Sequence, residues 1–188
     1  MEKIRSFVAV LLPETIRCRL AEIEESLKKT EADVRWVSSE NFHITLKFLG
    51  DVETDRIGLV TESIANASQG VAPFEVQLSG VGAFPSAGRA RVVWVGIDSG
   101  VEQLKHIAEQ LDLDLAKVGF PREDRPFSGH VTLGRVKTPR GLQALRAAME
   151  EIKGISIGSV TVDKIALMRS ELRPTGPIYT VLDEVKLG

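Results

Sequence analysis

The chain has 188 residues, of which 43% are hydrophobic and 27% charged, and its formal net charge is −2. This length suits one compact domain or two small lobes, and the ordinary composition excludes disordered, collagen-like and coiled-coil proteins. The longest apolar run, residues 7–12, is far shorter than the ~20 residues that cross a bilayer, and one cysteine excludes an intrachain disulfide. We therefore expect a cytoplasmic protein that contacts no membrane and needs no metal or other cofactor.

The first half of the chain is predicted to alternate strands with amphipathic helices. The predicted elements are a strand at 7–12, a helix at 14–29, a strand at 42–49, a helix at 55–68 and a strand at 74–78. Strict alternation of apolar and polar residues predicts that the second strand is half-buried. Its expected apolar face carries Phe42, Ile44, Leu46 and Phe48, and its expected polar face carries His43, Thr45 and Lys47.

The second half of the chain repeats this order of elements. The predicted elements are a strand at 92–97, a helix around 104–115, a strand at 130–136, a helix from Pro139 to Ile152, and strand-rich runs at 155–168 and 178–187. A turn at 173–177 separates the last two runs. The offset between the halves is constant at 87 residues, which relates His43 to His130 and Thr45 to Thr132.

A repeat of this length is too long for a solenoid and indicates a duplicated α+β unit. We expect a single bilobal domain over 1–188, with approximate repeat halves 1–90 and 91–188. Two antiparallel sheets, with helices on their outer faces, should flank a central cleft and be related by a pseudo-two-fold axis.

The two tetrads His43-Ile44-Thr45-Leu46 and His130-Val131-Thr132-Leu133 occupy equivalent points of the repeat. On a strand, residues i and i+2 share a face, so each histidine stands beside its threonine. Two such strands would present two imidazoles and two hydroxyls across one cleft. One copy alone is as readily a solvated edge strand, but two matched copies favour a functional site.

This arrangement suits proton transfer at a phosphodiester. Histidine gives or takes a proton near neutral pH, and two of them can act as general base and general acid in one displacement. Threonine hydroxyls can donate hydrogen bonds to the nonbridging phosphate oxygens, where charge develops. Neither a nucleophilic serine or cysteine nor a metal is required.

The sequence resembles the two-histidine phosphoesterase superfamily, in the branch of the RNA 2',3'-cyclic phosphodiesterases, also named 2'-5' RNA ligases. Besides the tetrads, the resemblance rests on segments 7–10, 35–37, 40–50, 82–85, 119–121, 130–135, 170–172 and 176–179. It departs from the family at Ser128-Gly129, where proline is usual, and at Gly134, where alanine is usual. Both departures concern the backbone of the strand that carries His130.

The resemblance implies hydrolysis of a 2',3'-cyclic phosphate at an RNA 3' end to a 2'-phosphate. It implies that His130 is the proton acceptor that activates water and that His43 is the proton donor to the departing 3' oxygen. Thr45 and Thr132 would hold the phosphate, and Arg135 would supply a charged contact. The reverse reaction, attack by a 5'-hydroxyl, would form a 2'-5' linkage.

Two of the candidate residues raise questions of position. Arg135 lies five residues after His130, so on a regular strand it would face the other way; it must reach around the strand or follow a bulge. Phe84 lies in a Gly/Pro-rich segment, where it is a candidate for stacking on a terminal base.

Several alternatives remain open at this point. The expected partners are RNA 3' ends, in a tRNA-like or short RNA, or cyclic nucleotides, and the chain is expected to be a monomer. A relative acting on small cyclic phosphates, such as ADP-ribose 1'',2''-cyclic phosphate or cyclic nucleotides, would carry the same residues. A noncatalytic nucleotide- or RNA-binding module is the alternative of another class, although binding alone needs no matched acid and base.

Overall fold

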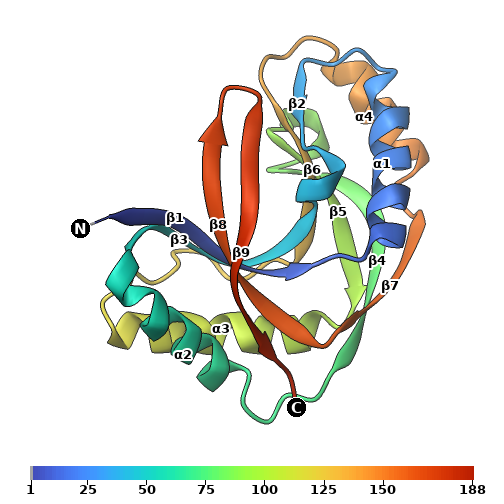
Figure 1. The fold of residues 1–188 in the computed structure, drawn as a ribbon. Coiled ribbons are helices and arrows are strands. Elements are labelled where there is room, and N and C mark those ends of the chain that lie inside the picture. Colours follow the sequence, from blue (N-terminus) through green and yellow to red (C-terminus); the bar gives the residue numbers. More distant parts are fainter. Residues whose placement is uncertain (1) are drawn as a thin grey trace.

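The computed structural model describes residues 2–188, which form one antiparallel sheet flanked by helices (Figure 1). The strands are β1 (Lys3–Leu11), β2 (Val34–Trp36), β3 (His43–Glu53), β4 (Phe74–Phe84), β5 (Val92–Ser99), β6 (His130–Val136), β7 (Ser156–Val162), β8 (Lys164–Arg173) and β9 (Gly176–Lys186). The helices are α1 (Glu14–Lys28), α2 (Ile57–Ala67), α3 (Val101–Lys117) and α4 (Leu142–Glu151). The predicted α+β class with a duplicated unit is confirmed.

The order of helices and strands follows the prediction, with differences in length. Strand β2 was not predicted, because three residues are too few to show a periodicity. Strand β4 continues to Phe84, which therefore ends a strand instead of lying in a loop. This part of β4 was not predicted because glycines at 80 and 82 interrupt the alternation of apolar and polar side chains that indicates a strand.

The two expected sheets are continuous with each other. The strand order is β7-β4-β5-β6-β3-β1-β8-β9, and β2 pairs with β6 outside this path. Strands β3 and β6, which carry the two tetrads, meet at the middle of the sheet. A single residue pair, Ile44 with Val131, joins them, so the sheet is divided into two lobes at this point.

The two lobes do not coincide with the two halves of the sequence. Strand β4, from the first half, pairs with β5 and β7 of the second half. The β8–β9 hairpin, from the second half, pairs with β1. Helices α2 and α3 pack together, as do α1 and α4, so each helix pair also draws on both halves (Figure 1). The repeats are therefore intertwined, and neither half has its own sheet.

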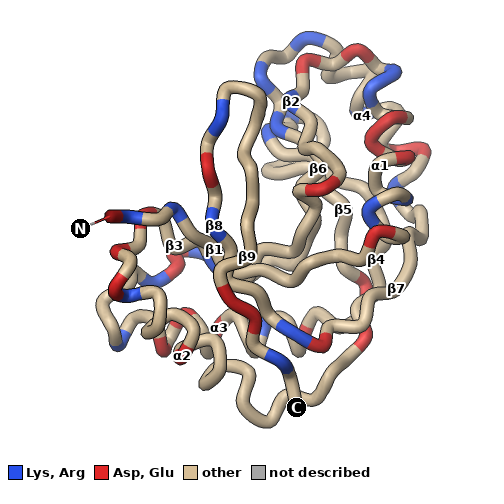
Figure 2. Tube along the Cα trace, viewed as in Figure 1, with Lys and Arg blue, Asp and Glu red and all other residues tan. Residues whose placement is uncertain are grey.

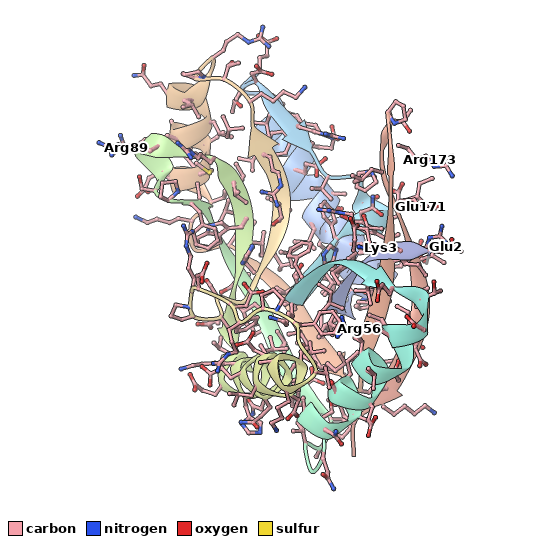
Figure 3. The ribbon with its side chains drawn as sticks, turned by 90° about the vertical axis from the view of Figure 1, so that its left-hand side faces the viewer. Glu2, Lys3, Arg56, Arg89, Glu171 and Arg173 are labelled. Atoms are coloured by element: carbon pink, nitrogen blue, oxygen red, sulfur yellow. The ribbon has the colours of Figure 1, made fainter. Side chains whose placement is uncertain are left out.

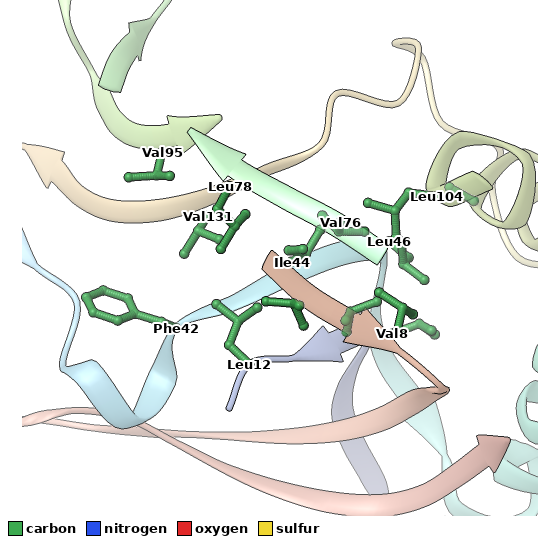
Figure 4. Packing of buried hydrophobic residues seen from close by; sticks show 14 of the residues in the cluster. Val8, Leu12, Phe42, Ile44, Leu46, Val76, Leu78, Val95, Leu104 and Val131 are labelled. Atoms are coloured by element: carbon green, nitrogen blue, oxygen red, sulfur yellow. The ribbon is translucent and has the colours of Figure 1, made fainter. Parts of the chain in front are cut away.

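All four helices pack on the same face of the curled sheet and enclose one large hydrophobic cluster. Figure 4 shows this packing around Val8, Ile44 and Val131, the last two of which are fully buried at the junction of the lobes. A second, small cluster of Phe7, Ala9, Ala166 and Met168 lies apart from it. In β1 these residues alternate with those of the large cluster, so the small cluster lies on the helix-free face of the sheet.

Figure 2 shows that Lys and Arg are interspersed with Asp and Glu along the chain in both lobes. Figure 3 shows Glu171 and Arg173 along the β8–β9 hairpin and Arg89 at the opposite side of the molecule. In residues 2–188 no helix combines the length and the apolar composition that crossing a membrane requires.

Candidate functional site

The pairing of Ile44 with Val131 places the two tetrads in one antiparallel register. In that register His43 lies opposite Thr132, and Thr45 lies opposite His130. The two histidines are therefore diagonal neighbours. In a regular antiparallel pair of strands the backbone positions of such neighbours lie about 7–8 Å apart. All four side chains line one cavity of about 760 Å³, whose lining also includes residues of α3 and of the segment 122–128. The structure thus brings together the four residues that the repeat singled out.

Each imidazole is oriented by a backbone carbonyl two residues before it. The Nδ1 atom of His43 lies 2.7 Å from the carbonyl oxygen of Asn41, and Nδ1 of His130 lies 2.7 Å from that of Ser128. Because a carbonyl only accepts hydrogen bonds, Nδ1 must carry a proton in both rings, and Nε2 is the lone-pair nitrogen of the neutral form. The Nε2 atom of His43 is 2.9 Å from the Thr45 hydroxyl, which donates to it when the ring is neutral.

Aromatic rings hold the imidazoles in place from the side. Phe7 and Tyr179 lie against His43, with centroid distances of 4.8 and 5.4 Å, and Tyr179 also lines the cavity. Phe84 meets the ring of His130 edge-on at 5.1 Å and packs on Trp94 at the same distance. Within residues 2–188 the lining of the cavity does not include Phe84. The structure therefore places Phe84 beside His130, as a support for the ring.

A β-bulge at the last residue of each tetrad changes which of the following residues face the cavity. Thr132 pairs with Trp94 and Gly134 with Val93, so Leu133 is an extra residue on β6. Beyond this bulge the side-chain alternation is inverted, and Arg135 returns to the face of His130. Arg135 accordingly lines the cavity because it follows a bulge, the second of the two positions expected for it.

Because of the equivalent bulge on β3, the predicted faces of Lys47 and Phe48 are wrong. Thr45 pairs with Ala9 and Lys47 with Val8, which leaves Leu46 as the extra residue. Lys47 therefore shares the helix-covered face with Val8 and is buried, instead of standing beside His43 and Thr45. Phe48, expected on the apolar face, is turned toward the cavity and is 57% exposed.

Lys47 belongs to a cluster of charges that forms the far wall of the cavity. Its Nζ atom donates to Asp112 Oδ1 of α3 at 2.6 Å and to the Pro121 carbonyl at 2.9 Å. Asp112 Oδ2 accepts from Arg122 Nε at 2.5 Å, and Oδ1 also accepts from the backbone N–H of Glu123 at 3.0 Å. These contacts attach the segment 119–129 to α3 and β3. Residues 122–128 of this segment line the cavity and lead into His130.

The surroundings lower the pKa of both histidines. For His43 the largest cause is burial, which disfavours the charged ring, and a positive charge on His130 lowers the pKa further. For His130 burial is again the largest cause, and the guanidinium of Arg135 adds to it. The carbonyls of Asn41 and Ser128 act in the opposite direction but do not outweigh burial. Within residues 2–188 no three His, Cys, Asp or Glu residues are grouped so that they could hold a metal.

The carbonyls that orient the rings and the cavity wall built by α3 were not predicted from the sequence. The carbonyls of Asn41 and Ser128 are backbone groups, so no residue type marks them. Their positions nevertheless differ by 87 residues, like the histidines. The same offset relates Phe48 to Arg135. Applying the offset to Arg135, already a candidate site residue, would have identified Phe48 as a candidate for the same cavity.

Comparison with known proteins gives a consistent picture. A profile of the family described as "LigT like Phosphoesterase" matches residues 10–94 and again residues 95–179. A protein of Methanothermobacter thermautotrophicus named RNA 2',3'-cyclic phosphodiesterase is 38% identical over 98% of this chain and 100% of its own length. A solved structure from Thermus thermophilus has a TM-score of 0.81 at 30% identity and covers 98% of both chains. The structure of E. coli LigT complexed with 3'-AMP has a TM-score of 0.78 at 27% identity and covers 99% of both chains.

Proposed function

Because the chain belongs to the LigT-like phosphoesterase family, we propose that it hydrolyses 2',3'-cyclic phosphates at RNA 3' ends to 2'-phosphates. The observation that carries the proposal is the diagonal placement of two imidazoles beside two hydroxyls in one cavity. The name of the Methanothermobacter relative supports this reaction, and the 3'-AMP complex of E. coli LigT supports a nucleotide at the site.

The reaction is an in-line displacement at phosphorus. The neutral Nε2 of His130 removes a proton from water, and the water oxygen forms a bond to phosphorus. The bond from phosphorus to the 3' oxygen breaks, and the protonated Nε2 of His43 donates its proton to that oxygen. The 2' oxygen keeps the phosphate, His130 ends protonated and His43 ends neutral. Proton exchange with solvent then restores both rings.

The charges around the two rings support this assignment of roles. The general base must be neutral at the start of the turnover, and the guanidinium of Arg135 favours the neutral form of His130. His43 must begin protonated, although burial lowers its pKa in the free protein. The negative charge of a bound cyclic phosphate raises that pKa again, because an opposite charge stabilises the imidazolium.

The remaining residues of the site stabilise the phosphate. Thr45 and Thr132 occupy the other diagonal of the register, so their hydroxyls flank the position between the histidines. Arg135 adds a positive charge on the same face. Such donors act most strongly where negative charge builds up in the transition state. With a 5'-hydroxyl in the place of water, the same groups would run the reaction toward a 2'-5' linkage.

Leaving-group substitution tests the function and the two roles together. Purified protein in EDTA should hydrolyse a nucleoside 2',3'-cyclic phosphate and release the 2'-phosphate, identified by chromatography. We expect His43→Ala and His130→Ala each to lower kcat by about 10²–10⁴, the usual contribution of one positioned proton-transfer group. A substrate with a better leaving group should restore activity to His43→Ala, which lacks the acid, and not to His130→Ala.

Thr45→Val and Thr132→Val are the matched controls, since each removes one hydrogen bond and no proton-transfer group. They should cost less than either histidine substitution and show no leaving-group rescue. Rescue of His130→Ala instead would reverse the two roles. Absence of turnover with cyclic phosphates by the unsubstituted protein would contradict the function itself.

A further inference from the structure

Two arginines lie directly opposite each other where β2 pairs with β6. Arg35 of β2 is the register partner of Arg135 of β6 in this antiparallel pair. Directly paired residues of antiparallel strands share a face, and their Cβ atoms lie about 4.5–5.5 Å apart. Like charges at such positions repel each other, so this pair lowers the stability of the sheet until an anion neutralises it.

The packing of β2 determines which face Arg35 occupies. Val34 and Trp36, the residues on either side of it, pack against the large hydrophobic cluster under the helices. By alternation Arg35 points to the opposite, helix-free face of the sheet, and it is exposed there. Arg135 reaches the same face through the bulge at Leu133 and lines the cavity. The two guanidiniums therefore extend the cavity at the edge where β2 replaces β3 as the neighbour of β6.

Within residues 2–188 no carboxylate neutralises this pair. The arginines that form ion pairs in this part of the chain are Arg122, Arg169 and Arg173. Asp33, the acidic residue closest to Arg35 along the chain, accepts a hydrogen bond from the Thr138 hydroxyl at 2.7 Å. Two adjacent guanidiniums, each a planar fork of N–H donors, are suited to bind the oxygens of a phosphate.

The register gives the distance of this pair from the phosphate-binding threonine. Thr132 pairs with Trp94 of β5, and Arg135 pairs with Val92, two residues away on the same strand. At about 3.4 Å per residue the two rows lie roughly 7 Å apart. Neighbouring phosphates of an RNA strand are separated by a comparable distance. A substrate whose cyclic phosphate lies at Thr132 can therefore place its next phosphate at Arg35.

We propose that Arg35 and Arg135 bind the phosphate on the 5' side of the terminal nucleotide, an inference that rests on the function proposed above. The ligand chemistry is a second phosphate group, one ribose away from the cyclic phosphate. An RNA 3' end carries this group as a phosphodiester, and the proposed function makes that phosphodiester the ligand. ADP-ribose 1'',2''-cyclic phosphate carries it as a pyrophosphate, and a cyclic mononucleotide lacks it.

The test compares substrates with and without the second phosphate. Adenosine 2',3'-cyclic phosphate lacks this phosphate, and an adenosine dinucleotide with a 2',3'-cyclic phosphate end carries it. We expect Arg35→Gln to lower kcat/KM for the dinucleotide roughly 5- to 50-fold, mainly through KM, because a charge-assisted contact is lost. The mononucleotide should be hydrolysed as before. Arg35→Lys should retain part of the preference for the dinucleotide, because it keeps the charge without the planar fork.

Three controls make the result specific. Adenosine 5'-phosphate 2',3'-cyclic phosphate has the second phosphate without a second nucleoside, and Arg35→Gln should lower its kcat/KM as it does for the dinucleotide. Arg91→Gln removes the same charge just before β5, where alternation turns the side chain to the other face, and it should change no substrate. Because Arg35 is exposed and faces a like charge, Arg35→Gln should not lower the free energy of unfolding measured in urea.

Each contrary result has a defined meaning. An equal loss for mononucleotide and dinucleotide in Arg35→Gln, or a loss for neither, would overturn the proposal. A loss for the dinucleotide without one for the 5'-phosphorylated mononucleotide would show a contact with the second nucleoside and would also overturn it. A loss confined to ADP-ribose 1'',2''-cyclic phosphate would overturn the assignment to RNA. An equal effect of Arg91→Gln would show a diffuse field instead of a site.

Equilibrium binding separates this proposal from the proposed function. If the unsubstituted protein turned over none of these substrates, the proposed reaction would fail, but binding of adenosine 2',5'-bisphosphate could still be compared with binding of adenosine 2'-phosphate. Arg35→Gln should weaken the bisphosphate roughly 5- to 50-fold and leave the monophosphate unchanged. An equal change in both ligands, or in neither, would overturn the second phosphate site whatever the outcome of the turnover assay.

Discussion

The imidazoles of His43 and His130 combine burial with a restricted set of hydrogen bonds. Burial lowers the pKa of both rings below the ordinary histidine value of 6.5, and it is the largest cause in each case. The Nδ1 proton of each ring is committed to a backbone carbonyl, so only Nε2 exchanges protons with the cavity. A positive charge on His130 also lowers the pKa of His43, although less than burial does.

The lowered pKa values predict where the pH profile lies. The profile of kcat/KM reports the free protein, and the active form needs one protonated and one neutral ring. We expect a bell with its maximum below pH 6.5, since both pKa values lie below the ordinary one. The profile of kcat should have its maximum at higher pH, because the bound phosphate raises both pKa values. Initial rates at fixed ionic strength measure both profiles.

Arg135→Gln provides the matched variant for this prediction. Removing the guanidinium removes a charge that lowers the pKa of His130, so the kcat/KM bell should move toward higher pH. A maximum of kcat/KM above pH 7 in the unsubstituted protein would contradict the prediction. So would a profile that Arg135→Gln leaves in place.

At the scale of elements, the two bulges show how one repeat builds two different walls. The helix-covered position after the bulge is Lys47 on β3, where it binds Asp112 of α3. The equivalent position on β6 is Gly134, where an added Cβ would come within 2.6 Å of Val34 and 2.8 Å of Trp36 of β2. The glycine therefore allows β2 to pack closely on β6, whereas a buried ion pair takes the equivalent place in the other lobe.

The Lys47–Asp112 pair should determine how firmly segment 119–129 is attached. Both side chains are nearly buried, at 2% and 10% exposure. We expect Asp112→Asn to lower the free energy of unfolding by about 3 kcal/mol, because the buried ammonium loses its shortest carboxylate contact and keeps only the Pro121 carbonyl and the Glu123 carboxylate at 3.6 Å. Lys47→Met should cost less, since Asp112 keeps its contacts with Arg122 and the Glu123 N–H. Urea unfolding measures both changes.

The pH dependence of this effect follows from the pKa of Asp112. Burial alone would raise that pKa, but the hydrogen bonds from Lys47, Arg122 and the Glu123 N–H outweigh it and lower the pKa. A lowered pKa in the folded state contributes stability at neutral pH that is lost as the pH falls below about 4 and through the folded-state pKa. The difference between the protein and Asp112→Asn should therefore shrink in acid. Asp114→Asn, on the same helix but paired with the exposed Lys117, should change stability little.

For the whole molecule, the charge distribution limits how RNA is held. The net charge is −2, and basic and acidic residues are interspersed along the chain in both lobes (Figure 2). Long-range attraction to the phosphate backbone should accordingly be weak, and contacts should be confined to the end of the RNA. Strength of binding should depend on the cyclic phosphate and its nucleotide and hardly on RNA length.

Salt dependence tests this expectation. For single-stranded RNA, each neutralised phosphate contributes a slope of about −0.7 in a plot of log K against log salt concentration. We expect a slope between about −0.7 and −2, corresponding to about one to three phosphates, for a trinucleotide and for a 20-mer with the same cyclic end. A markedly steeper slope for the longer RNA would show an extended basic groove that the charge distribution does not predict.

The sequence by itself determined the α+β class and the duplication, and it singled out His43, Thr45, His130 and Thr132, which the structure places in one cavity. Each of these follows from local signals: the period of apolar residues, the parity of a strand and a constant offset of 87 residues. Such signals depend on residues that are close in the sequence, so they can be recognised without knowledge of the tertiary contacts. Together with the segments around the tetrads, they were sufficient to indicate the family.

Only the tertiary structure decided which half supplies which lobe and which residues beyond the tetrads face the cavity. The exchange of β4 and of the β8–β9 hairpin between lobes depends on strand pairing across long distances in the chain. The bulges at Leu46 and Leu133 are defined by the register against β1 and β5, and each inverts the side-chain parity of its strand. Phe48, Lys47 and Arg135 owe their positions to this inversion, which no pattern within a single strand encodes.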